Sequence, residues 1–415
     1  RDPGWLQASA GRILDPNAFR RAPGPGPREG RERESDMNRR HFLRAGALAG
    51  AAAALPLDAT AASIRRAPFA PWRGSGTVDD PLRLNANENP LGLGPKAREA
   101  AENAFSVANR YTDNWSQPFR LKLADHLGVE ADRLFLGNGS TEILQMAVQA
   151  LGRDGARIVT GNPTFEDVAT YRRPLGTELV PVPLDARYAH DLGRMREEAS
   201  RASGPAIAYL CNPNNPTGTL TPHDEMAAWI EEDEETFFII DEAYFELVEE
   251  PGFASFLSWT AHRPNLLVVR TFSKIYGLAG LRMGYGVAHG DTVGRFTEWM
   301  AKNNTNQIAI AAASASLDDP DHVRRSLETN RQSRMLVLET LDELGFAALP
   351  SHTNFLMHEI GMDVADYQRL FLDAGIAVGR AFPPMLQYNR LSFGTPEEMG
   401  RWAQTLRDLR RRGQV

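Results

Sequence analysis

A carboxylate stands at the end of a strongly apolar segment in the middle of the chain. Asp241 directly follows Phe237–Ile240, four apolar residues that are typical of a strand buried on both faces. Desolvation penalises a charged carboxylate in such a place unless a cation accompanies it. We therefore expect a cation to face Asp241 in the folded protein.

Four other segments with residues that could bind a ligand or take part in a reaction also come at the ends of expected strands. With Asp241 and Tyr244, they are Gly139-Ser140-Thr141, Pro163-Thr164-Phe165, the run NPNNPTG (212–218) and the run TFSK (271–274). In open α/β sheets, ligands bind beyond the carboxyl ends of the strands. Their common position therefore predicts one ligand site at one edge of a sheet.

The elements that would position these segments alternate between strands and helices. We expect strands at 133–138, 157–161, 177–184, 206–213, 236–244, 265–274 and 282–288, and helices at 95–108, 121–127, 139–151, 164–173 and 222–232. This alternation predicts an α/β fold with a mostly parallel sheet covered by helices on both faces. Beyond Gly290 the pattern changes to long helices up to residue 344 and then to shorter elements at 353–359, 363–374 and 390–395, with a closing helix from Pro396, which indicates a second lobe.

Composition narrows the function classes. The chain has 415 residues, 42% of them hydrophobic, and a net charge of −7, which suits two lobes with full cores and argues against a nucleic-acid surface. The one cysteine, Cys211, has no partner for an intramolecular disulfide and is expected to be a small buried hydrophobe. The nine histidines show no metal-ligand spacing, so we expect no metal site.

The first 61 residues differ in composition from the rest of the chain. Residues 1–36 are rich in Arg, Pro and Gly without an apolar period, so we expect them to be disordered, with Met37 as a candidate for the native first residue. Arg39 and Arg40, an Ala/Leu/Gly-rich stretch and Ala59-Thr60-Ala61 follow, as in a twin-arginine export signal with a small-residue cleavage site. A flexible Ala-rich arm is the other interpretation.

Eight segments, in order, resemble one known family. They are LNANENP, NRYTD, GNGSTE, PTF, NPNNPTG, DEAYFE, TFSKIYGLAGLRMGY and RLSFGT, and the resemblance extends over about residues 82–412. Together they are similar to the fold-type-I pyridoxal-phosphate aminotransferases of class I/II, and most of all to histidinol-phosphate aminotransferases. The resemblance implies a large domain with a mostly parallel seven-stranded sheet, a small α/β C-terminal domain, the cofactor pyridoxal 5′-phosphate and a homodimer.

The resemblance assigns catalytic roles to Lys274, Asp241 and Tyr244, and a cofactor-binding role to Asn214. Lys274 matches the lysine that binds the cofactor covalently and then acts as general acid and base. Asp241 would pair with the protonated pyridine nitrogen, which supplies the cation expected above. Tyr244 and Asn214 match the pair that donates to the phenolic oxygen of the cofactor.

The phosphate and ring of the cofactor have their own expected partners. Backbone N–H groups at a helix start, hydroxyls and a guanidinium suit a phosphate. The residues are Gly139, Ser140, Thr141, Thr271, Ser273 and Arg282, with Phe165 stacked on the ring. Tyr111 matches a tyrosine that reaches the phosphate of the neighbouring subunit. For Phe165 and Tyr111, ordinary core packing is the alternative.

The substrate has three expected partners. Arg390, in YNRLSFGT, matches the arginine that holds the substrate carboxylate, a task that suits a bidentate guanidinium. Arg380 lies near the position of a second substrate-contacting arginine, although its spacing from Gly375 is one residue longer than the family pattern. Asn87 belongs to a loop that lines the pocket entrance in relatives.

These interpretations divide the chain into six parts. We expect a disordered tail (1–36), a signal (37–61), a linker (62–80), a segment joining the small domain (81–110), the large cofactor-binding domain (111–300) and the small domain (301–415). The predicted activity is ping-pong transfer of an amino group from a small-molecule amino donor to a 2-oxo acid such as 2-oxoglutarate.

The donor and the location stay open. A histidinol-phosphate-like donor follows from the resemblance, whereas an export signal favours an aromatic or other amino acid, because histidine synthesis is expected in the cytoplasm. A decarboxylase or lyase on the same fold and a non-catalytic binding protein are further alternatives. The location is periplasmic or exported through the twin-arginine machinery, or cytoplasmic if the signal is not used.

Overall fold

The computed structural model describes residues 74–153 and 155–415 of the chain. They belong to one compact unit, Ala70–Val415. The expected tail (1–36), the expected signal (37–61) and most of the expected linker (62–80) lie outside the described residues.

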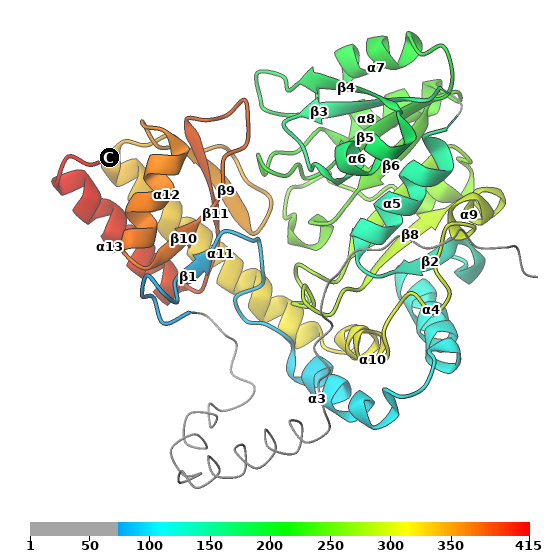
Figure 1. The fold of residues 1–415 in the computed structure, drawn as a ribbon, viewed down its shortest axis with the longest axis horizontal. Helices are drawn as coiled ribbons and strands as arrows, with labels where there is room; N and C mark the ends of the chain where they lie inside the picture. Colours follow the sequence, from blue (N-terminus) through cyan, green and yellow to red (C-terminus); the bar gives the residue numbers. More distant parts are fainter. Residues whose placement is uncertain (1–73, 154) are drawn as a thin grey trace, which may run out of the picture. The chain divides into compact units, whose positions relative to one another are not determined.

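A seven-stranded sheet forms the centre of the larger lobe (Figure 1). In spatial order its strands are β2 (Leu134–Gly137), β8 (Gly284–Ala288), β7 (Leu266–Thr271), β6 (Phe237–Asp241), β5 (Ala206–Cys211), β3 (Arg157–Asn162) and β4 (Glu178–Pro183). Only the two pairs that β8 makes, with β2 and β7, are antiparallel. The predicted α/β fold with a mostly parallel sheet is confirmed.

The central strands β5, β6 and β7 are buried at every position. Alternate side chains of a strand point to opposite faces, so two cores result. Leu210 and Ile240 belong to one core, and Tyr209 and Ile239 belong to the other. Continuous apolar runs of this kind require helices on both sides of the sheet.

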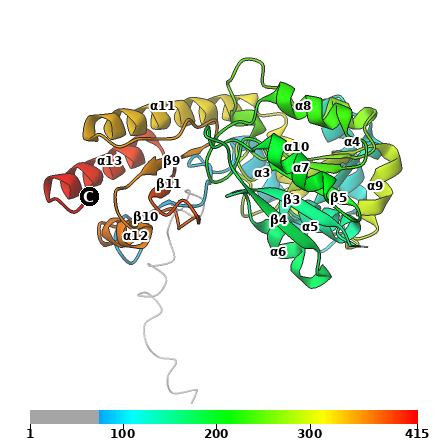
Figure 2. The ribbon, with the colours of Figure 1, turned by 90° about the horizontal axis from the view of Figure 1, so that it is seen from above.

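Helices cover both faces of the sheet, and Figure 2 shows α8 and α6 on opposite sides of the strands. The core that contains Leu210 receives α3 (Pro95–Ala104), α4 (Asp113–Leu127), α7 (Leu192–Ser200), α8 (His223–Glu232) and α10 (Gln307–Ser316). The core that contains Tyr209 receives α5 (Ser140–Leu151), α6 (Asp167–Tyr171) and α9 (Gly290–Thr297). Short 3₁₀ helices cover Phe105–Val107, Ala131–Arg133, Arg173–Leu175, Phe245–Leu247 and Ser258–Ala261.

The smaller lobe joins the start and the end of the described chain. Strand β1 (Leu82–Leu84) pairs in parallel with β10 (Ile376–Val378), and β9 (Phe355–Glu359) pairs antiparallel with β11 (Tyr388–Ser392). Helices α11 (Pro320–Leu344), α12 (Val364–Asp373) and α13 (Pro396–Arg411) pack on these strands around Trp402 and Tyr367. None of the helices in the described part of the chain is long and apolar enough to cross a membrane.

Two helices differ from the sequence-based expectation. The helix expected at 164–173 is α6, only five residues long. Thr164 and Phe165 lie before its start and line the cavity described below, and Pro174 disfavours continued α-helix at the residue before it. The amphipathic helix α7 was not predicted, because only Met195 and Ala199 in its mostly polar sequence are buried.

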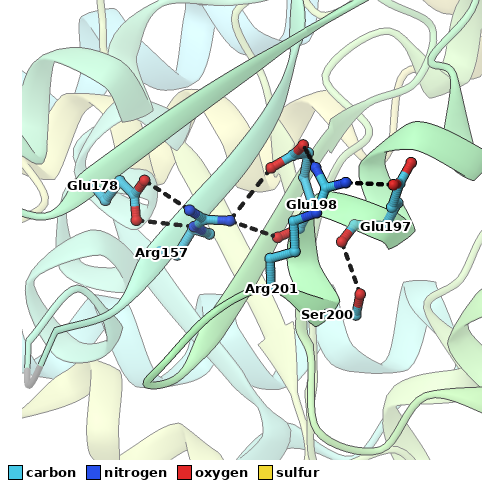
Figure 3. A network of polar contacts seen from close by, with 6 residues as sticks. All are labelled: Arg157, Glu178, Glu197, Glu198, Ser200 and Arg201. Carbon is cyan, nitrogen blue, oxygen red and sulfur yellow. Dashed lines mark hydrogen bonds and ion pairs between the residues drawn. The ribbon is translucent and has the colours of Figure 1, made fainter.

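The amino-terminal edge of the sheet carries a network of ion pairs (Figure 3). Arg157, the first residue of β3, donates two hydrogen bonds of 2.9 Å to the carboxylate of Glu178, which is its register partner on β4. The same guanidinium also contacts Glu198 on α7 at 3.3 Å. The charges at this edge therefore have protein partners.

Candidate active site

The five segments singled out in the sequence meet at the carboxyl-terminal edge of the sheet. There they surround a cavity of about 320 Å³. Its walls include Ser140 and Thr141 after β2, Thr164 and Phe165 after β3, Asn215 after β5, Asp241 and Tyr244 at β6, and Thr271, Ser273 and Lys274 at β7. The smaller lobe and the segment before α3 close the cavity with Asn87, Arg380, Phe382 and Arg390.

Asp241 is the last residue of β6 and is 2% exposed. Its Oδ2 accepts a hydrogen bond of 2.9 Å from the hydroxyl of Tyr209, and its Oδ1 accepts one of 3.1 Å from the backbone N–H of Ala243. Burial raises the pKa of Asp241 to about 6 despite these bonds, and the nearby Lys274 lowers the pKa only slightly. Asp241 thus lines the cavity and forms no ion pair with any cation of the described residues.

Lys274 follows β7 by three residues, and its amine lies 5.3 Å from the centre of the Tyr244 ring. Burial lowers the pKa of Lys274 to about 8, and the positive charge of Arg390 lowers it further. A larger share of the amine is therefore neutral near pH 7 than for an exposed lysine. A neutral amine in a cavity can act as a nucleophile and as a base.

Arg282 and the start of α5 form a pocket for an anion. The Nη1 of Arg282 lies 3.4 Å from the hydroxyl of Ser273, and its Nη2 lies 3.4 Å from the hydroxyl of Thr141. Helix α5 begins at Ser140 without a side-chain cap, so its first backbone N–H groups are available as donors. A guanidinium, hydroxyls and a helix start together favour a phosphate.

Gly139 makes room for this arrangement but does not line the cavity itself. Its φ is +82°, and a Cβ at this position would lie 2.1 Å from the Nη2 of Arg282. The glycine therefore allows both the turn into α5 and the close approach of the guanidinium. Thr271 supports the pocket by donating a hydrogen bond of 2.9 Å to Ser273.

The asparagine of NPNNPTG that lines the cavity is Asn215 rather than the expected Asn214. Asn214 uses its whole amide in contacts with its own loop and with the residues that follow β3. Its Nδ2 donates to the carbonyl oxygen of Pro163 and to Thr217, and its Oδ1 accepts a bond of 2.7 Å from Thr164. These contacts leave Asn214 no free donor for a ligand, so the assignment to Asn214 is corrected.

Arg390 and Asn87 lie on the side of the smaller lobe. Arg390, on β11, is 7% exposed and donates to the Oδ1 of Asn215 at 2.7 Å and to the carbonyl oxygen of Asn85 at 2.8 Å. Its Nε has no partner among the described residues, and burial lowers its pKa to about 10. Asn87 donates a hydrogen bond of 3.0 Å to the hydroxyl of Tyr244. Arg390 thus retains a buried donor for an anionic ligand.

The remaining expected residues differ in exposure. Arg380 lies at the mouth of the cavity, where it forms an ion pair of 2.7 Å with Glu166. Phe165 is partly buried against the core and lines the cavity, which suits a residue that stacks on a ring. Tyr111 is 80% exposed and is not part of the cavity, so the alternative of core packing is wrong for this residue.

Several residues at the site were missed in the sequence, among them Phe382, Tyr209, Asn215 and Glu166. Tyr209 was not identified, because the register that pairs Cys211 with Asp241, and so brings Tyr209 to the same face of the sheet, is known only from the structure. Asn215 stands in a motif already identified, one position later. Glu166 had no signal, because its partner Arg380 comes from the other lobe.

Known proteins match this chain along most of its length. Residues 79–406 match the family model Aminotransferase class I and II, and residues 36–56 match the model of the TAT (twin-arginine translocation) pathway signal sequence. The chain is 34% identical to the histidinol-phosphate aminotransferase of Brevibacillus brevis and 35% identical to histidinol-phosphate aminotransferase 1 of Dechloromonas aromatica, in each case over 79% of this chain and 90% of the relative. The crystal structure of histidinol-phosphate aminotransferase from Sinorhizobium meliloti in complex with pyridoxal-5′-phosphate is 29% identical and aligns with a TM-score of 0.73, over 79% of this chain and 91% of that one.

Proposed function

The chain belongs to the class I and II aminotransferases, and we propose that it transfers the amino group of a histidinol-phosphate-like amino-alcohol phosphate to a 2-oxo acid such as 2-oxoglutarate. The enzyme uses pyridoxal 5′-phosphate. One observation carries the proposal: a single cavity gathers Lys274, Asp241, Arg282 and Arg390, each of which fits a different part of the cofactor or the substrate. The donor is inferred from the names of the relatives.

The residues present fit pyridoxal phosphate. Asp241 offers a buried carboxylate that forms no ion pair within the described residues, which suits a protonated ring nitrogen. Arg282, Ser273 and the uncapped start of α5 offer donors for a phosphate, and Phe165 offers an apolar ring. Lys274 provides the amine. When bound, the cofactor supplies a ring that accepts the electrons left on the substrate carbon when it loses a proton.

Lys274 moves the proton in the proposed mechanism. Its pKa of about 8 lets the Nζ atom accept a proton from the Cα of the donor and return it near neutral pH. The neighbouring charge of Arg390 favours the neutral amine, which keeps more of the amine able to accept a proton near neutral pH. The nearby ring of Tyr244 limits the positions that the amine can take.

Hydrogen bonds orient two donors toward the cavity. The hydroxyl of Tyr244 accepts from Asn87, so its own proton remains available for an acceptor in the cavity. The Oδ1 of Asn215 accepts from Arg390, so its Nδ2 remains available in the same way. Both side chains therefore act as donors to an anionic oxygen of a bound group.

Arg390 positions the substrate. Its fixed contacts to Asn215 and Asn85 hold the guanidinium in place before a ligand arrives. Such preorganisation reduces the ordering that binding requires. A carboxylate or phosphate near its unpaired Nε would place the reacting carbon in the cavity that also contains Lys274.

We also propose that the enzyme is a homodimer. Tyr111 and Phe105 are large aromatic side chains that are 80% and 67% exposed, and both lie in the segment that joins α3 to α4. Neighbouring exposed aromatics favour an interface. Contact of Tyr111 with the cofactor phosphate of the partner subunit would complete each site.

A second candidate donor is an aromatic amino acid used outside the cytoplasm. The match of residues 36–56 to a twin-arginine signal favours this candidate, because that route exports folded proteins. Periplasmic residence is part of the same proposal. A decarboxylase or lyase activity on this fold remains the competing chemistry.

A panel of amino donors tests these assignments. Each donor is mixed with the holoenzyme without an acceptor, and the change in cofactor absorbance and the release of a 2-oxo acid or a 2-oxoalkyl phosphate are measured. We expect conversion of the cofactor to its amino form with the best donor and no conversion in Lys274→Ala. Release of carbon dioxide without any oxo product would contradict the proposal.

A further inference from the structure

An ion pair crosses the mouth of the cavity. Glu166, directly after the cavity-lining Phe165, accepts a hydrogen bond of 2.7 Å from the Nη2 of Arg380, which comes from the smaller lobe. Both side chains line the cavity and are about half exposed, at 57% and 54%. The carboxylate of Glu166 therefore takes up a hydrogen-bond donor of Arg380, whose side chain also lines the cavity in which we place the substrate.

Arg380 and Arg390 form a two-arginine site around one ring. The guanidinium carbons of Arg380 and Arg390 lie 4.2 Å and 4.6 Å from the centre of the Phe382 ring. The charge of Arg380 lowers the pKa of Arg390, whereas Glu166 raises it, so the three charges act on one another. One short molecule with two anionic groups could contact both arginines, and Glu166 is the group it would displace.

The pair is suited to displacement. Exposed ion pairs of this kind contribute little, because water screens them and both side chains lose freedom. Arg390 differs, since it is buried and held by Asn215 and Asn85. The cavity thus contains one fixed arginine and one arginine held by a replaceable carboxylate.

We propose that Glu166 determines the substrate specificity of the site by competing with the second anionic group of a substrate for Arg380. Glu166 lowers the affinity for dianionic substrates and leaves the affinity for monoanionic substrates nearly unchanged. The inference rests on the proposed function only in placing the substrate between Arg390 and Arg380. It adds a residue that opposes, rather than attracts, the second anion.

Binding of two unreactive acids to the holoenzyme tests the proposal. Glutarate has two carboxylates and pentanoate has one, at the same chain length, and titration calorimetry gives the dissociation constant of each. We expect Glu166→Gln to bind glutarate about two- to five-fold more tightly than wild type does, and pentanoate equally well. In the Arg380→Gln background, Glu166→Gln should no longer affect glutarate.

A matched variant controls for the loss of one negative charge. Glu232 pairs with Arg196 at the same distance of 2.7 Å and with similar exposure, but outside the cavity. Glu232→Gln should leave both dissociation constants unchanged. An unchanged affinity of Glu166→Gln for glutarate, or an equal gain for both acids, would overturn the inference.

The two proposals can fail separately. If the holoenzyme forms an oxo product from a donor but Glu166→Gln binds glutarate as wild type does, the specificity inference alone is wrong. If no donor yields an oxo product, the proposed function is wrong, whatever affinity the variants have for glutarate.

Discussion

The two edges of the central sheet treat charge in opposite ways. At the amino-terminal edge, Arg157 and Glu178 neutralise each other across β3 and β4 (Figure 3). At the carboxyl-terminal edge, within the part of the chain that the structure describes, Asp241 ends β6 without an ion pair and the Nε of Arg390 has no partner. The pKa values of one carboxylate at each edge differ in the same way. The hydrogen bond from Arg157 lowers the pKa of Glu178, whereas burial raises the pKa of Asp241.

This difference distinguishes charged groups that are placed to bind a ligand from charged groups that only pair with one another at the solvent-exposed surface. A buried charge that lacks a partner destabilises the fold, so it persists where a bound group supplies the partner. An exposed pair has little effect on either stability or activity. Variants at the two edges should therefore behave differently, and the following experiments test this contrast.

Removal of the cavity lysine should have the largest effect. Lys274→Ala loses the amine that is proposed to hold the cofactor and to move the proton, so we expect turnover to fall by about 10⁴-fold or more. Initial rates of oxo-product formation measure this effect. Lys122→Ala, on the surface of α4, should retain the wild-type rate. Comparable turnover in Lys274→Ala and wild type would remove the lysine from the mechanism.

Neutralisation of the carboxylate in the cavity should come next. Asp241→Asn keeps the shape of the side chain but can no longer keep a ring nitrogen protonated, and we expect kcat to fall by about 10²–10³-fold. The matched change at the other edge, Glu178→Gln, should leave kcat unaltered. Equal kinetics for the two variants would erase the proposed difference between the edges.

Asp241→Asn should also stabilise the folded protein once the cofactor has been removed. The folded-state pKa of Asp241 is raised to about 6, so the folded chain binds the proton more tightly than the unfolded chain does. The resulting penalty is absent below pH 4, grows between pH 4 and pH 6 and is fully present above that range. Asp241→Asn should remove on the order of 2–3 kcal/mol of penalty at pH 7.5.

Urea unfolding of the cofactor-free proteins measures this gain. The advantage of Asp241→Asn over wild type should be large at pH 7.5 and clearly smaller at pH 5. An advantage that is the same at both pH values would mean that the charge of Asp241 is not the cause.

The smallest effect is expected at the surface network. Glu178→Gln removes an exposed partner of Arg157, which retains Glu198 as a neighbour. We expect the thermal midpoint to remain within the scatter of replicate melts, with any difference disappearing at high salt. A clear loss of stability would show that this edge also depends on specific charges.

The sequence was most informative where local chemistry decides the structure. The continuous apolar runs predicted the buried strands β5, β6 and β7, and the residues after them predicted the edge at which the cavity lies. The direction of a side chain within a loop was not predictable. Asn214 and Asn215 are the same residue type, and only the contacts with Thr164 and Arg390 distinguish them.

Contacts between distant segments were also beyond sequence reasoning. The pair of Glu166 and Arg380 depends on how the two lobes meet at the cavity. The exposure of Tyr111 likewise follows from the path of the chain between α3 and α4, which no local pattern specifies. The missed helix α7 shows the same limit, since its few apolar residues gain meaning only against the sheet.

The most direct test of the account asks where the cofactor is attached. The holoenzyme is treated with borohydride, digested and analysed by peptide mass spectrometry. The account predicts that the added pyridoxyl mass lies on Lys274 and on no other lysine. Attachment to another lysine, with Lys274 unmodified, would contradict the claim that the charges at the carboxyl-terminal edge of the sheet exist to hold this cofactor.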